Sequence, residues 1–138
     1  MIYSRRDLTL LSAGLIAATA HAQKTVMPSR AYRFEDLEVK GKADNHSRAV
    51  LDGLTHSGFH IDLHETELGS GMAPHAPHHH EHEEMMMIRE GTLEVTISGK
   101  AVSVGPGSVV YVASNEEHGL RNVGKSTAHY FVIALGRD

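Results

Sequence analysis

Hydrophobic and polar residues alternate with a period of two in several short segments after residue 58. In residues 59–63, Phe59, Ile61 and Leu63 alternate with polar side chains, and residues 93–97 repeat the pattern. A period of two indicates strands that bury one face. We therefore expect the three apolar side chains of the first segment to face the core.

Apolar runs at 85–88, 109–112 and 128–135 predict further strands, and glycine-rich stretches separate many of these segments. Gly99 and Lys100 are expected to form a tight hairpin turn. Beyond the N-terminal segment, no run of ten or more residues has the i, i+3, i+4 apolar spacing of a helix. Short strands with glycine-rich turns predict an all-β sandwich or barrel.

Residues 1–22 have the features of a cleavable export signal. A short basic region precedes an apolar run, and Ala20-His21-Ala22 fits an A-x-A cleavage pattern. The apolar run is shorter than the about 20 residues that span a bilayer, so we expect no stable membrane insertion. The pair Arg5-Arg6 resembles a twin-arginine signal, and a general secretory signal is the alternative. Either signal predicts a periplasmic or secreted protein.

We divide the rest of the chain into an N-terminal arm, residues 23–57, and a barrel, residues 58–138. The arm is weakly patterned, and residues 40–48 read as a polar connector. A length of 138 residues suits one domain with a real core. The net charge of −4 gives no basic patch for nucleic acid, and the absence of cysteine excludes disulfides and thiolate ligands.

Histidine changes this picture, because the chain has twelve and five of them lie in residues 75–84, HAPHHHEHEE. If this block is a strand, His78 and His80 leave the same face, and Glu84 follows after a polar bend. Two imidazoles and a carboxylate then converge on one cation and leave coordination positions open. A solvated histidine loop that scavenges metal without defined geometry is the alternative.

A fourth ligand must come from elsewhere in the chain, and His118 is the candidate because it follows a loop and starts a predicted strand. The remaining histidines have plainer interpretations. We expect His79 and His82 to be bystanders, and His60 and His64 to lie at the surface or at a subunit interface.

These residues resemble the cupin family, whose first motif is G-(x)5-H-x-H-(x)3,4-E-(x)6-G. His78, His80, Glu84 and Gly91 fit its spacing, whereas Met72 stands in place of the opening glycine. Taking Glu83 as the carboxylate ligand would break the spacing on both sides, so Glu84 is preferred.

The second cupin motif is G-(x)5-P-x-G-(x)2-H-(x)3-N. Gly107, His118 and Asn122 match it, and Ala113 and Asn115 replace its proline and its second glycine. Asparagine tolerates the left-handed backbone that glycine would adopt there. The resemblance covers roughly residues 58–135.

The resemblance implies a cupin jelly-roll β-barrel, a double-stranded β-helix, with His78, His80, Glu84 and His118 as ligands of one divalent metal ion. Some members of the family use the three histidines alone. An open site with these ligands favours manganese or iron, with nickel, cobalt, zinc and copper also possible. Cupins of this size usually pair, so we expect a homodimer.

Two classes of function follow from this reading. The first is a small metal-dependent enzyme of the dioxygenase, isomerase or lyase type, acting on a small oxygenated substrate. His129, Tyr111 or a displaced Glu84 would then supply the general base. The second is a non-catalytic module that binds or stores a metal or a sugar-like ligand. Polar side chains around an open metal position would favour the enzyme, and an all-apolar lining would favour the module.

Overall fold

A computed structural model describes residues 26–137, so the predicted export signal, residues 1–22, lies outside the described residues. Apart from one 3-10 turn, η1 (Phe34–Asp36), the regular elements are strands. They are β1 (Val39–Lys42), β2 (Asn45–Leu54), β3 (Phe59–Leu68), β4 (Glu83–Glu90), β5 (Leu93–Ile97), β6 (Lys100–Val104), β7 (Val109–Val112), β8 (His118–Asn122) and β9 (Ala128–Arg137).

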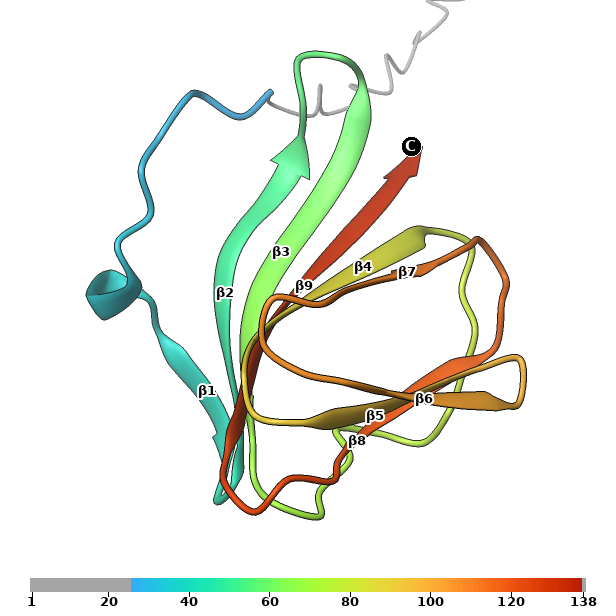
Figure 1. The fold of residues 1–138 in the computed structure, drawn as a ribbon. Coiled ribbons are helices and arrows are strands. Elements are labelled where there is room, and N and C mark those ends of the chain that lie inside the picture. Colours follow the sequence, from blue (N-terminus) through green and yellow to red (C-terminus); the bar gives the residue numbers. More distant parts are fainter. Residues whose placement is uncertain (1–25, 138) are drawn as a thin grey trace, which may run out of the picture.

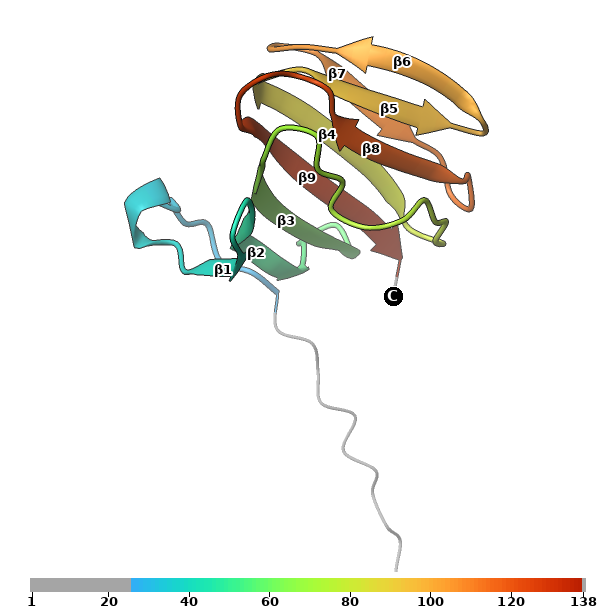
Figure 2. The same cartoon turned by 90° about the horizontal axis from the view of Figure 1, so that it is seen from below.

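The strands form two sheets that face each other across the core (Figure 1, Figure 2). The larger sheet has the order β1-β2-β3-β9-β4-β7, and the smaller has the order β6-β5-β8. All of the paired neighbours are antiparallel. The long crossovers between the sheets produce the all-β jelly roll expected from the sequence.

Alternate residues of both sheets point inward and make one core. Its members share near-complete burial and come from β3, β4, β5, β7, β8 and β9. They are Leu68, Met86, Ile88, Leu93, Val95, Val110, Val112, Leu120, Ala128, Tyr130 and Val132. Side chains in a strand leave opposite faces in turn, so Met86 is buried while its neighbour Met87 is 46% exposed.

β3 turns a different face inward from the one predicted. Thr66 and Leu68 are buried and share a face with His64, which lines a cavity between the sheets. Phe59, Ile61 and Leu63 therefore lie on the outer face, since side chains two residues apart leave the same side of a strand. The prediction failed because this part of the inner face is polar and the outer face is apolar.

The N-terminal arm contributes strands of its own. The polar connector predicted at residues 40–48 is instead the β1–β2 hairpin, and β2 pairs with β3 over most of its length. Phe34 of η1 packs its ring 4.5 Å from the Arg48 guanidinium carbon of β2. Polar residues occupy both faces of β2, because Asn45 and Ser47 line a polar cavity and Arg48 forms ion pairs with Glu65 and Glu67 of β3.

The β5–β6 hairpin turns one residue earlier than predicted. Ile97 pairs with Lys100, so the turn residues are Ser98 and Gly99, with φ values of 46° and 77°. Positive φ at both central residues is the geometry that matches the twist of a tight hairpin. Asn115 has a φ of 62°, which confirms the left-handed backbone expected at this position.

No helix in the described part of the chain is long and apolar enough to cross a membrane.

Asn122 fastens three chain segments at the end of β8. Its side-chain amide donates to the Leu68 carbonyl at 2.7 Å and to the Ser126 carbonyl at 2.8 Å. Its side-chain oxygen accepts from the Gly124 amide at 2.9 Å. The side chain is fully buried, so each of these partners would lose its bond in a place with little water.

We predict that Asn122→Ala lowers the free energy of unfolding by about 3 kcal/mol, because it leaves buried backbone groups without partners. Urea unfolding followed by circular dichroism measures the change. The neighbouring exposed residue provides the control: Arg121→Ala should cost less than about 1 kcal/mol. Equal losses in the two variants would contradict a fastening role for Asn122.

Candidate metal centre

The segment between β3 and β4 carries most of the histidine block and runs beside β8 (Figure 2). It is held there at both ends by backbone hydrogen bonds. Gly71 donates to Asn122 and Asn122 donates to Met72, both at 2.9 Å. Farther along, His78 and His118 exchange two backbone bonds of 2.9 Å. The block is therefore not the regular strand predicted but a loop with a single bridge to β8.

Close backbone approach at β8 depends on a glycine. A Cβ atom on Gly119 would lie 3.0 Å from the Pro77 side chain, tighter than normal packing. His80, two residues after the bridge, is held as well, because the Asn115 amide donates to the His80 carbonyl at 2.7 Å. These contacts fix the backbone on either side of His78 before any ligand is considered.

Three imidazole rings gather at this bridge. The ring centroids of His78 and His80 are 5.2 Å apart, and the His118 ring lies 4.7 Å from the first and 4.8 Å from the second. One ring nitrogen from each histidine falls within 4.8 Å of the others, as required of ligands of one ion. The structure thus brings together three of the residues predicted from spacing.

Glu84 completes the cluster from the start of β4. Its two carboxylate oxygens lie 3.2 Å from Nε2 of His80 and 3.6 Å from Nε2 of His118. Glu83, the alternative carboxylate, is exposed, and Tyr111 donates a hydrogen bond to it, which raises the pKa of the Tyr111 hydroxyl. The structure therefore places Glu84, and not Glu83, with the histidines.

The hydrogen bonds of the two rings determine where their protons lie. Nδ1 of His80 is 2.8 Å from the His82 carbonyl, and Nδ1 of His118 is 2.9 Å from the Glu116 carbonyl. A carbonyl only accepts, so Nδ1 carries the proton in each ring. In the neutral rings both Nε2 atoms then present lone pairs, and they face the carboxylate oxygens of Glu84.

Lone pairs that face one another need a cation or a proton between them. Nε2 of His118 and Nδ1 of His78 are also buried without a hydrogen-bond partner. Burial is the main cause that lowers the pKa of His78, and the neighbouring histidines add to it. A lowered pKa favours the neutral imidazole, the form that binds metals. The three histidines therefore fit a divalent metal ion, and Glu84, which lies beside two of them and also groups with His80 and His82, can supply an oxygen ligand.

The other histidines of the block surround this cluster. His79 is exposed, in agreement with its expected bystander role. His82 is closer than expected, because its ring stacks on His80 at 3.7 Å. Burial is the main cause that lowers the pKa of His82. His75 meets the edge of the His78 ring at 4.3 Å.

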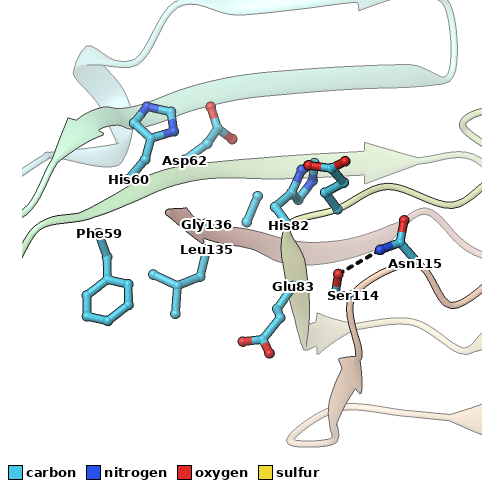
Figure 3. Close-up of a pocket in the computed structure, with 11 residues that line it drawn as sticks. Phe59, His60, Asp62, His82, Glu83, Ser114, Asn115, Leu135 and Gly136 are labelled. Carbon is cyan, nitrogen blue, oxygen red and sulfur yellow. Dashed lines mark hydrogen bonds between the residues drawn. The ribbon is translucent and has the colours of Figure 1, made fainter. Parts of the chain in front are cut away.

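Besides a cavity of about 230 Å3 that has Pro77, His118 and Arg121 in its wall, two cavities lie near the cluster. The inner cavity, of about 230 Å3, lies between the sheets and has Glu84 and His118 in its wall. The outer cavity, of about 910 Å3, lies at the mouth of the barrel around His82 (Figure 3). We call them the inner cavity and the mouth.

The inner cavity is lined by polar side chains that the sequence reading did not select. They are Asn45, Ser47, His64, Thr66 and Tyr130. Nδ1 of His64 lies 3.1 Å from a carboxylate oxygen of Asp62, which itself lines the mouth. The signal was present in the sequence, because His60, Asp62 and His64 alternate on one face of a strand, but that face was assigned to the outside.

The two residues proposed as general bases lie elsewhere. His129 alternates with Tyr130, which lines the inner cavity, and bonds Glu65 through Nδ1 at 3.2 Å on the outer face of the larger sheet. Tyr111 alternates with the buried Val110 and Val112 and is 53% exposed. The structure does not bring either side chain into the cavities beside the cluster.

Solved structures share this fold at low sequence identity. An RmlC-like cupin from Shewanella frigidimarina NCIMB 400 is 16% identical, with a TM-score of 0.64 over 78% of this chain and 92% of that one. The polyketide cyclase RemF from Streptomyces resistomycificus is 24% identical, with a TM-score of 0.63 over 79% and 80%. A predicted oxalate decarboxylase from Thermotoga maritima is 17% identical, with a TM-score of 0.64 over 78% and 99%.

No curated protein sequence matches the chain. The model of the cupin domain matches residues 61–134, which is more than half of the 138 residues. This match spans β3 to β9 and includes His78, His80, Glu84 and His118. The chain therefore belongs to the cupin family.

Proposed function

We propose that the chain is an exported metal-dependent enzyme that acts on a small oxygenated substrate. One divalent ion would be held by His78, His80, Glu84 and His118. The observation that carries the proposal is the convergence of three imidazole rings, with Nε2 of His80 and of His118 lying 3.2 Å and 3.6 Å from the Glu84 carboxylate. Manganese or iron is the favoured ion for three imidazoles and a carboxylate with open positions.

The lining of the inner cavity supports an enzyme over a non-catalytic binding module. An amide, two aliphatic hydroxyls, a phenol and two imidazoles line the space beside Glu84 and His118. A storage site needs only the ligands, whereas a substrate needs groups that orient it and move its protons. RemF, a structural neighbour, is a polyketide cyclase, which is compatible with catalysis on this fold.

Asp62 and His64 are suited to proton transfer. The carboxylate accepts the Nδ1 proton of His64, and Nε2 is then the ring atom that accepts a proton. When bound, the metal would act as a Lewis acid toward substrate oxygens. His64 would take a proton from the substrate, Asp62 would orient the imidazole, and Thr66 and Tyr130 would donate or accept hydrogen bonds to substrate hydroxyls.

The export route affects which metal the protein binds, because it determines the compartment in which the chain folds. Copper and zinc bind imidazole more tightly than manganese or iron in open competition. A twin-arginine pathway carries folded proteins, so a chain that folds in the cytoplasm would bind manganese or iron there and arrive loaded. The proposed signal in residues 1–22 and the proposed metal thus support one another.

We predict that untagged protein from the periplasm begins near Gln23 and contains about one manganese or iron ion per chain. Intact mass and elemental analysis measure the two quantities. His118→Ala should lose the metal, because it removes a buried ligand, whereas His79→Ala should keep it. Stoichiometric zinc would contradict the folded-export argument, and metal retained by His118→Ala would contradict the site.

With the first substrate that turns over, His64→Gln should lower kcat by about 10²-fold to 10⁴-fold, the usual contribution of a general base. Asp62→Asn should shift the pH profile of kcat, because it changes the partner of Nδ1. His60→Gln is the control, since His60 bonds Asp52 at 2.7 Å and does not line the inner cavity. Unchanged kcat in His64→Gln would exclude it as the base.

We also propose a homodimer formed through the outer face of the larger sheet. Two rows of side chains cross this face, as the strand registers show: Leu63, Ile133, Met85 and Tyr111 in one, and Phe131, Met87 and Val109 in the other. Met87, Val109 and Tyr111 are about half exposed, at 46%, 60% and 53%. Contiguous apolar surface of this kind favours a protein partner.

Met87→Glu should therefore convert the dimer to a monomer, because it buries an unpaired charge in the interface. Light scattering after gel filtration measures the mass. Val102→Glu is a matched control, since Val102 is 51% exposed but belongs to the smaller sheet. A wild-type chain that is monomeric at all concentrations, or a dimer that survives Met87→Glu, would contradict this interface.

A further inference from the structure

The charge distribution around the cluster limits the kind of ligand that can reach it. Glu84 is the one carboxylate among the described residues that line the inner cavity, and none of them is lysine or arginine. Burial raises the pKa of Tyr130, so its hydroxyl stays protonated and neutral. The inner cavity therefore offers hydroxyl, amide and imidazole groups, but no fixed cation to pair with an anion beyond the metal.

The mouth is acidic. Asp62, Glu81 and Glu83 are among the described residues that line it, and these include no lysine or arginine. In Figure 3, Asp62 and His60 lie on the same side of the sheet as His82, and Glu83 points to the other side. This negative charge lies close to the cluster, because His82 of the mouth stacks on His80 at 3.7 Å, and it acts against an anion there.

The other histidine of the mouth besides His82 does little to offset this charge. His60 is 2.7 Å from Asp52, so any positive charge on it is already matched by a carboxylate. A carboxylate substrate would lose its hydration on the way in without gaining a protein cation.

The size of the inner cavity sets a second limit. Its volume of about 230 Å3 is below the about 300–1,000 Å3 of sites that hold drug-sized ligands, so it suits a small ligand. Thr66, Ser47 and Asn45 line one side of this space and both donate and accept hydrogen bonds. Such groups match alcohols, which also donate and accept, better than they match carboxylates, which only accept.

We propose that the site takes a small neutral polyol or sugar-like diol, and that it discriminates against carboxylates of the same size. The inference rests on the proposed function, because the ligand is placed against the same four metal-binding residues. The hydroxyls of the ligand would bond Asn45, Ser47 and Thr66, while the acidic mouth would repel its oxidised, anionic counterparts.

Erythritol and its carboxylate, erythronate, test this choice at low ionic strength. Backbone amide shifts of Thr66 and Tyr130 report binding in the inner cavity by NMR, in both the zinc-loaded and the metal-free chain. Erythritol should bind at least as tightly as erythronate in both forms, although a carboxylate is the better ligand for a free divalent ion. Erythronate binding more tightly than erythritol in either form would overturn the proposal.

Removing negative charge from the residues of the mouth tests the electrostatic contribution to ligand selectivity. Glu81→Gln/Glu83→Gln should raise erythronate affinity by about tenfold and leave erythritol affinity within about twofold. The control, Glu38→Gln/Glu90→Gln, removes two exposed acids elsewhere and should change neither affinity. An unchanged erythronate affinity in the mouth variant would also overturn the proposal. Zinc uptake, measured by elemental analysis, is a separate result: its failure contradicts the metal site, while the metal-free titration still decides the ligand class.

Discussion

The two backbone hydrogen bonds between His78 and His118 are the constraint on which the site depends. They join a loop with no regular structure to an edge strand of the smaller sheet, and they bring together side chains forty positions apart in the sequence. Gly119 allows the close approach, and Asn122 anchors the far end of the same loop. These hydrogen bonds restrict the positions of the three rings, and Glu84, the second residue of β4, lies beside them.

Backbone carbonyls near the His78–His118 bridge also determine how the ring nitrogens of the cluster are oriented. Each Nδ1 of His80 and His118 is held by a carbonyl, one from the histidine loop and one from the loop before β8. Backbone carbonyls thus orient both lone pairs toward Glu84 without any contribution from a bound ion. A site preorganised in this way loses less conformational entropy on binding a metal than one whose side chains must first be ordered.

The motif spacing predicted the jelly roll through its resemblance to the cupin family, and the four residues that it selected lie together in the structure. H-x-H with a glutamate four residues on, and a distant histidine at the start of a strand, need only local geometry to be recognised. The same reasoning could not predict which face of β3 points into the barrel. Phe59, Ile61 and Leu63 look like a core stripe, but the interior at that point is a polar cavity and the apolar stripe lies outside.

That single reversal accounts for most of what the sequence reading missed. It hid His64 and Asp62 from the candidates for proton transfer. His129 was chosen on the face of Phe131 and Ile133 in β9, which is also an outer face. The parity of a strand identifies two faces but not which one is inward. In a barrel with a polar cavity and an apolar outer surface, the more hydrophobic face is the wrong choice.

The central claim is that four side chains converge on one ion, and anomalous diffraction from crystals of the manganese-loaded protein tests it most directly. The account predicts one strong peak at about 2.0–2.3 Å from ring nitrogens of His78, His80 and His118 and from a carboxylate oxygen of Glu84. A peak at the Glu65, Glu67 and His129 group on the outer face, or no ordered peak at the histidine loop, would contradict it.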